Sequence, residues 1–199
     1  MYSLFYRFIQ KILLKRSFYD DFLNVIKDDH INHIVEIGCA DSIILDKLNK
    51  NFYYDGFDVV DKFIERSKKK YFNISNYKFK NQSIHEINFE NYNHDKTIIL
   101  LVGVFHHVSD EYIKIFLNNT KNFKVYAIDA VRIKDQNFFT KLLMDFDRGK
   151  YVRYQEHYKD LLTQYNFFLA RNKYLNFKYD HLISFKNLNI NKIKETLEI

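Results

Sequence analysis

A short apolar run that ends in a glycine turn, at His33 to Ser42, constrains the fold of this chain most strongly. It runs His-Ile-Val-Glu-Ile-Gly-Cys-Ala-Asp-Ser, and apolar residues at helical spacing follow it. This pattern predicts a buried strand, a tight turn at Gly38, and a helix over 42–49 capped by Asp41 or Ser42. A glycine lets the backbone turn where a side chain would meet a ligand, at the strand end where open α/β sheets bind ligands.

Helix-like and strand-like segments alternate along the rest of the chain. Helical spacing covers 1–18, 19–27, 42–49, 61–71, 110–117, 136–146 and 155–165, and strand-like runs cover 33–37, 52–57, 77–80, 97–102, 125–128, 167–175 and 181–185. Such alternation predicts an α/β protein with a mostly parallel sheet and helices on both of its faces. No internal repeat, low-complexity linker or domain boundary interrupts the pattern, so we expect one domain over 1–199.

Composition narrows the class of protein. The chain has 199 residues, enough for one sizeable core, and its hydrophobic content of 47% argues against disorder. A single cysteine precludes an internal disulfide and fits a reducing compartment, so we expect a cytoplasmic protein. No apolar run approaches the ~20 residues of a membrane span. The net charge of +6 is compatible with nucleic acid, but lysine is abundant together with Asn, Ile, Tyr and Phe, which indicates coding bias.

The segment 1–30 is expected to form N-terminal helices. Its first part, 1–18, carries aromatic and aliphatic residues at helical spacing with basic residues between them. A helix that packs on the domain or forms a lid over its pocket is the favoured interpretation, and an amphipathic helix resting on a membrane is the alternative.

A second candidate site is Asp58, which ends the second predicted strand about 20 residues after the glycine turn. A carboxylate at this place can accept hydrogen bonds from both hydroxyls of a ribose. A helix cap is the alternative, because a helical segment follows.

These motifs resemble those of a known family. Val-Glu-Ile-Gly-Cys-Ala-Asp-Ser is similar to the first motif of class I S-adenosylmethionine (SAM)-dependent methyltransferases, with Ala40 and Ser42 where later glycines usually stand. Gly-Val-Phe-His-His-Val, from Gly103, resembles the family's fourth-strand segment. Asp-Arg-Gly-Lys-Tyr-Val-Arg at 147–153 and Phe-Lys-Tyr-Asp-His at 177–181 resemble a bacterial subset, with Lys178 and Asp180 departing from its pattern. The resemblance implies a Rossmann-like, seven-stranded sheet with extra N-terminal helices.

The resemblance also assigns cofactor contacts to individual residues. It implies that Glu36 orients the cofactor's amino group, that Asp58 holds the ribose, and that Gly103 admits the methionine part. Ser83 stands where the family carries an aspartate for the adenine amino group, and Gln82 could substitute for it. The remaining implied contacts are a backbone cradle and an adenine sandwich, formed by Gly38, Cys39 and Ala40 and by Val59 and Ile84.

Several polar residues have more than one interpretation. His106 is the candidate catalytic base, because an imidazole titrates near neutrality. The alternatives are a structural or cofactor-supporting role and metal ligation, but adjacent histidines on an extended segment point opposite ways, so we expect no metal. Arg148 and Arg153 could clamp an anionic acceptor or tie their turn to the domain. Tyr179 and His181 could line the acceptor pocket or belong to the core.

The function implied is transfer of the SAM methyl group to a small-molecule, sugar or lipid-intermediate acceptor, by a monomer or homodimer. Two alternatives are a catalytically silent SAM-binding protein, favoured by the substitutions at Ala40, Ser42 and Ser83, and an RNA-directed methyltransferase. A nicotinamide dehydrogenase is less favoured, because Glu36 lies within the first strand and the three glycines of a pyrophosphate turn are missing.

Overall fold

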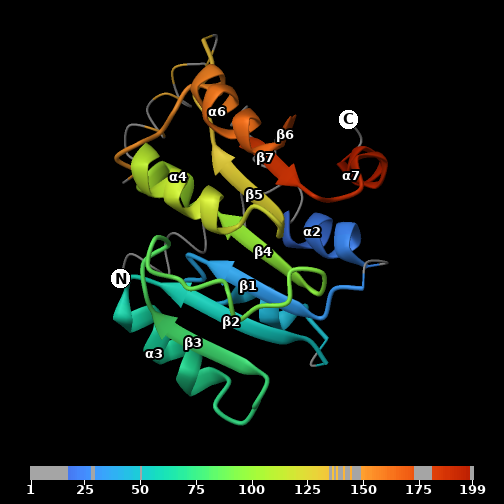
Figure 1. Ribbon diagram of the computed structural model, residues 1–199. Coiled ribbons are helices and arrows are strands. Elements are labelled where there is room, and N and C mark those ends of the chain that lie inside the picture. The colour runs from blue at the N-terminus through green and yellow to red at the C-terminus, as the bar shows by residue number, and fades with distance from the viewer. Residues whose placement is uncertain are drawn as a thin grey trace.

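The computed structural model describes residues 18–27, 30–49, 51–134, 136, 138, 141, 144, 149–172 and 181–197. Their strands form one seven-stranded sheet in the order β3-β2-β1-β4-β5-β7-β6 (Figure 1). The strands are β1 (His33–Ile37), β2 (Tyr53–Asp58), β3 (Tyr77–Asn81), β4 (Thr97–Val102), β5 (Lys124–Ala130), β6 (Phe168–Asn172) and β7 (His181–Lys186). The first five strands pair in parallel, while β7 is antiparallel to both β5 and β6. The mostly parallel sheet predicted from the alternation is confirmed.

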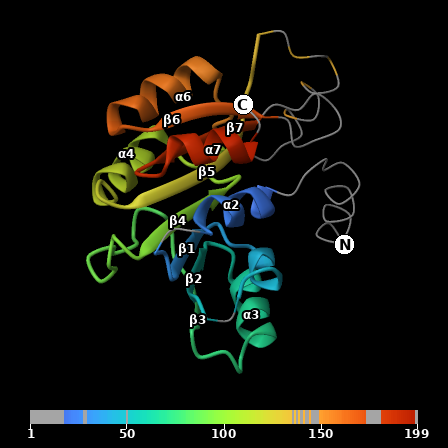
Figure 2. The ribbon, with the colours of Figure 1, turned by 90° about the vertical axis from the view of Figure 1, so that its right-hand side faces the viewer.

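Two apolar cores cover the two faces of this sheet. One core packs α2 (Phe18–Ile26), α3 (Asp61–Lys70) and α7 (Ile190–Leu197) against side chains such as Ile34 and Tyr54. The other packs α4 (Asp110–Asn119) and α6 (Gln155–Leu162) against Val35, Ile37 and their neighbours. Successive residues of β1 thus enter opposite cores, as the two-residue period of a strand requires. Figure 2 shows α4 on the opposite side of the sheet from α2 and α3.

The helix predicted over 42–49 is wrong in type and length. The structure has the four-residue 3₁₀ helix η1 (Ile43–Asp46) instead, and Ser42 precedes it in the left-handed region with φ of 51°. The Ser42 hydroxyl lies 3.2 Å from the Ser67 hydroxyl and does not cap η1, while Asp41 pairs with Arg66 at 2.5 Å. The side chains of Asp41 and Ser42 therefore contact residues of α3 and do not cap η1, and the turn remains compact.

The first helix of the described residues was predicted from the sequence, and the last one was not. The helix predicted over 19–27 corresponds to α2, whose Phe22, Val25 and Ile26 enter the core beside Ile193 of α7. The proposed lid before Phe18 lies outside the described residues. The helix α7 was not predicted, although its apolar residues recur at helical spacing. Among the described helices, none is long and apolar enough to cross a membrane.

Candidate active site

The turn after β1 is held against the end of β2 by its own backbone. The N–H groups of Gly38 and Cys39 both donate to the Phe57 carbonyl, at 2.8 and 3.0 Å. Gly38 has φ of 69°, and a Cβ there would lie 2.6 Å from Val104 Cγ2, so only glycine fits. The Cys39 side chain is buried, and burial raises the pKa of its thiol. These residues thus supply a tight, close-packed turn at the carboxyl edge of the sheet, and the Cys39 thiol stays protonated.

Asp58 joins that turn to β2. Its side chain is 8% exposed, and Oδ2 accepts a hydrogen bond of 2.9 Å from the Ala40 N–H. Oδ1 accepts a second bond of 2.9 Å from the Val60 N–H at the start of α3. The carboxylate therefore makes a cap-like contact, which the sequence left open as an alternative, and it also fixes the glycine turn. Each oxygen keeps a second lone pair that can accept a ribose hydroxyl.

Glu36 lies beneath the turn, on the face of the sheet that carries α2. Its side chain is 1% exposed, and its two oxygens accept hydrogen bonds from the hydroxyls of Tyr54 on β2 and Tyr19 on α2. Burial raises the pKa of this carboxyl from 4.5 to about 8, although the two tyrosine hydrogen bonds act to lower it. Sequence reasoning identified Glu36 but not its tyrosine partners, because nothing local in the sequence relates them.

This buried carboxyl makes stability depend on pH in a defined window. Below pH 4.5 it is protonated in both states, and as the pH rises toward 8 only the folded state retains the proton. The stabilisation that Glu36 contributes is therefore lost as the pH rises, by about 1 kcal/mol per pH unit within this window. We expect urea unfolding between pH 5 and pH 8 to show this fall for the wild type and a flatter profile for Glu36→Gln. Parallel profiles would contradict the assignment.

The proposed adenine contacts flank the ends of β2 and β3. Val59 is 66% exposed, whereas Ile84 is buried in the second core. The Gln82 N–H donates to the Asp58 carbonyl at 3.1 Å, which sets the segment after β3 beside the ribose candidate. The Ser83 hydroxyl lies 2.9 Å from His85 Nδ1, and the Gln82 amide donates to the Glu86 carbonyl at 2.7 Å. The structure thus brings these residues together, with the Ser83 and Gln82 side chains already engaged.

His106 belongs to the 3₁₀ helix η2 (Phe105–His107) after β4, and it is 6% exposed. Its Nδ1 is hydrogen-bonded to Oδ1 of Asp129 at the end of β5, and Oδ2 of Asp129 accepts from the Phe105 N–H at 2.6 Å. Gly103 has φ of 66°, and a Cβ there would lie 3.4 Å from His106 Cε1. The imidazole is therefore oriented by a carboxylate and turns one edge toward Gly103. No local signal in the sequence predicts this contact, because His106 and Asp129 lie 23 residues apart.

A second glycine allows the chain to pass over this imidazole. A Cβ on Gly149 would lie 2.2 Å from His106 Cδ2 and 3.0 Å from the His106 carbonyl oxygen. The Tyr151 N–H donates to that same carbonyl at 2.8 Å. The segment from Gly149 to Tyr151 thus covers one edge of the His106 ring, and no larger residue than glycine fits at its start.

The four acceptor-site candidates have different outcomes. Arg148 and Tyr179 lie outside the described residues. Arg153 is 4% exposed, and its guanidinium donates to Asp110 and to three backbone carbonyls, which favours the structural role that the sequence left open. His181 begins β7 opposite Ala130, the last residue of β5, and so lies at the same edge of the sheet as His106.

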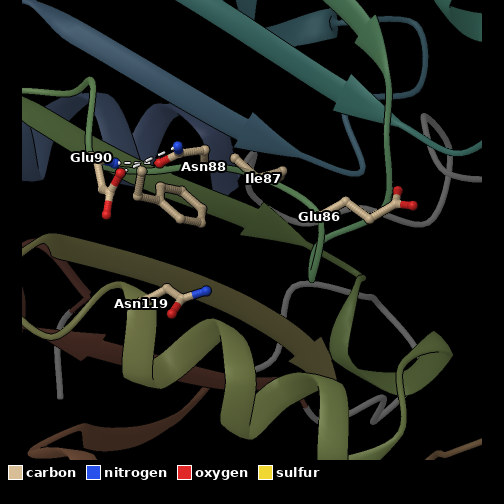
Figure 3. A pocket seen from close by; sticks show the side chains of 6 residues that line it. Glu86, Ile87, Asn88, Glu90 and Asn119 are labelled. Atoms are coloured by element: carbon tan, nitrogen blue, oxygen red, sulfur yellow. Dashed lines mark hydrogen bonds between the residues drawn. The ribbon is translucent and has the colours of Figure 1, made fainter.

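A surface hollow lies beside the segment that follows β3. It has a volume of about 420 Å³ and is lined by residues 86–90 and by Asn119 at the end of α4 (Figure 3). Among the described residues there is no group of three His, Cys, Asp or Glu side chains that could hold a metal ion.

No protein-family model and no curated protein sequence matches this chain. Several solved structures match its fold. The methyltransferase domain of bacterial CtHen1 aligns over 84% of this chain and 95% of its own, with 13% identity and a TM-score of 0.63. Human N-acetylserotonin methyltransferase in complex with SAM aligns over 84% and 51%, with 15% identity and a TM-score of 0.60, so this chain spans about half of it. N-methyltransferase NodS from Bradyrhizobium japonicum, in complex with S-adenosylhomocysteine, aligns over 83% and 82%, with 13% identity and a TM-score of 0.59.

Each of these structures is of a methyltransferase or its methyltransferase domain, and each matches the fold of this chain at low sequence identity. The chain therefore has the fold of class I SAM-dependent methyltransferases. A shared fold does not by itself define an activity.

Proposed function

We propose that this protein is a SAM-dependent methyltransferase that acts on a small-molecule acceptor. The observation that carries the proposal is the link between the glycine turn and the acid of β2, made by the Ala40 N–H on Asp58. This link sets a turn without a side chain at Gly38 beside a carboxylate with spare acceptor capacity, at the edge of the sheet where open α/β folds bind nucleotides. Two of the similar structures are of methyltransferases named for small molecules, N-acetylserotonin and mitomycin.

The residues at this edge fit SAM. Asp58 would accept from the ribose hydroxyls, the exposed Val59 side chain would pack on the adenine, and Gly103 leaves space for the methionine part. SAM supplies an activated sulfonium methyl group when it is bound. The protein then contributes mainly by aligning the acceptor and excluding water.

His106 is the residue that we assign as the base for an acceptor hydroxyl or amine. Asp129 holds Nδ1, which fixes the tautomer and leaves Nε2 as the nitrogen that would take the proton. The same carboxylate stabilises the imidazolium that forms. His181, at the neighbouring strand end, is proposed to line the acceptor site.

Calorimetric titration with SAM, S-adenosylhomocysteine and NAD tests the cofactor assignment. We expect micromolar binding of the two adenosyl ligands, weakened about 10- to 100-fold in Asp58→Ala, because hydrogen bonds to a carboxylate are lost. Asp55→Ala is the matched control, since Asp55 lies on the same strand but pairs with His33 at 2.7 Å. A folded protein that binds neither adenosyl ligand would contradict the proposal.

A further inference from the structure

The carboxyl group of Glu36 is enclosed by hydroxyl groups from two other elements. Its side chain is 1% exposed, Tyr54 of β2 donates to Oε2, and Tyr19 of α2 donates to Oε1 at 3.3 Å. Glu36 lies on the same face of β1 as Ile34, which belongs to the core beneath α2 and α3. The two contacts therefore join β1 to β2 and to α2 inside that core, two residues before Gly38.

The same cluster supports the glycine turn from below. The Cys39 thiol is buried and lies beside the Glu36 carboxyl and the Tyr54 hydroxyl. The Tyr54 ring packs closely on Gly56, since a Cβ on Gly56 would lie 2.9 Å from Tyr54 Cε1 and 3.0 Å from Cys39 Sγ. The turn thus packs on the Tyr54 side chain, and Glu36 holds the hydroxyl of that side chain.

A ligand ammonium group would require a charged carboxylate at Glu36. Burial raises the pKa of this carboxyl from 4.5 to about 8, so near neutral pH most of the folded protein holds it protonated. Among the described residues, none of the titratable groups that face it is a cation; they are Tyr19, Tyr54, Cys39 and Asp58. A neutral acid inside the core is suited to hold its neighbours and poorly suited to bind a cation.

We propose that Glu36 is a positioning residue for the cofactor turn, which acts through Tyr54 and Tyr19 and does not contact the ligand. This role differs from the contact to the cofactor's amino group that the sequence resemblance implies. It rests on the proposed function, because it concerns the turn that would hold the same cofactor. Loss of the Glu36 carboxyl then weakens every adenosyl ligand by the same factor, whether or not the ligand carries an amino acid part.

Calorimetric titration with S-adenosylhomocysteine and with 5′-methylthioadenosine, which lacks the amino acid part, distinguishes the two roles. Glu36→Ala leaves the Tyr54 and Tyr19 hydroxyls without their acceptor, so we expect about 10-fold weaker binding of both ligands. Glu36→Gln keeps the shape and has an amide that can serve both hydroxyls, so it should bind both ligands within about threefold of the wild type. A direct contact predicts instead that Glu36→Gln weakens S-adenosylhomocysteine alone, because an ion pair is lost.

Tyr54→Phe tests the path through the hydroxyl without a change at Glu36. It should weaken both ligands by the same factor, about 3- to 10-fold, because the buried carboxyl loses a donor. Tyr77→Phe is the matched control, because its ring lies 5.9 Å from that of Tyr54 but its buried hydroxyl has no hydrogen-bond partner among the described residues. This control should bind both ligands as the wild type does.

Circular dichroism should show that each variant is folded, and if Glu36→Ala is not, Glu36→Gln and Tyr54→Phe decide the question. If the wild type binds neither adenosyl ligand, the proposed function itself fails. If the wild type binds S-adenosylhomocysteine and Glu36→Gln loses more than about tenfold of that affinity, Glu36 contacts the ligand and the positioning role is overturned. Wild-type affinity for both ligands in folded Glu36→Ala and Tyr54→Phe would also overturn it, since the turn would not depend on this cluster.

Discussion

Replacement of Arg153 by methionine is expected to destabilise the protein by about 3–5 kcal/mol. Its guanidinium donates through Nε and Nη2 to Asp110 Oδ1, at 2.8 and 2.6 Å. It also donates to the carbonyls of Phe105, Tyr151 and Val108, at 2.6, 3.0 and 2.6 Å. Loss of this buried group leaves several acceptors without donors, and an unsatisfied buried acceptor costs more than the bond itself contributed.

The pKa of Asp110, the partner of Arg153, reflects the same interaction. Burial acts to raise the pKa of Asp110, but the hydrogen bonds from Arg153 and His157 outweigh it and leave that pKa below its ordinary value. Arg153 also connects the segment that covers His106 to η2 and the start of α4, so the variant should lose activity together with stability.

Urea unfolding at 25 °C measures the effect. Arg66→Met is the comparison, because Arg66 pairs with Asp41 at a partly exposed site and such pairs contribute about 1 kcal/mol or less. The stability of Arg153→Lys should fall between those of the wild type and Arg153→Met, because one ammonium cannot reach both Asp110 and the backbone carbonyls. A loss of stability below about 1 kcal/mol for Arg153→Met would show that water donates hydrogen bonds to these acceptors in the variant.

Replacement of His106 by asparagine is expected to lower turnover by about 10²- to 10⁴-fold, the usual contribution of a positioned acid or base. An asparagine amide can still donate to Asp129, so the contact that orients η2 is preserved while the base is lost. Binding of S-adenosylhomocysteine should therefore change by less than about threefold, and stability should remain close to that of the wild type.

Turnover is measured with an acceptor that the wild type methylates, as a function of pH. The rise of the wild-type rate with pH, which reflects deprotonation of the base, should disappear in His106→Asn. His107→Asn is the matched control, because its exposed ring lies 4.0 Å from that of His106 but not on Asp129. A full rate in His106→Asn would assign the histidine a structural role, and alignment of the acceptor would then account for catalysis.

Much of the fold could be predicted because its signals are local. Apolar runs such as Thr97–Val102 are buried on both faces, which identifies central strands of a parallel sheet. The strand β7 was located, but its antiparallel direction was not, since direction depends on the path of the preceding connection. The 3₁₀ helix η1 was mistaken for a longer helix, because apolar spacing does not register the left-handed conformation of Ser42.

The candidate site could be predicted only in part from the sequence. Gly38 and Asp58 stand at strand ends, and topology alone places strand ends at one edge of the sheet. Asp129 and Tyr54 were missed as partners of His106 and Glu36. Asp129 reaches His106 across 23 residues and Tyr54 reaches Glu36 across 18, so neither contact follows from local spacing.

The sequence by itself therefore determined the alternation of elements, the glycine turn and the acid that follows it, because backbone conformation and burial periodicity are properties of short segments. The tertiary structure alone decided which polar side chains meet. In the structure Arg153, a candidate residue for binding the acceptor, is buried and pairs with Asp110. His106 pairs with the carboxylate of Asp129. The physical reason is that a hydrogen bond requires two groups within about 3 Å, and strand register and packing set that distance.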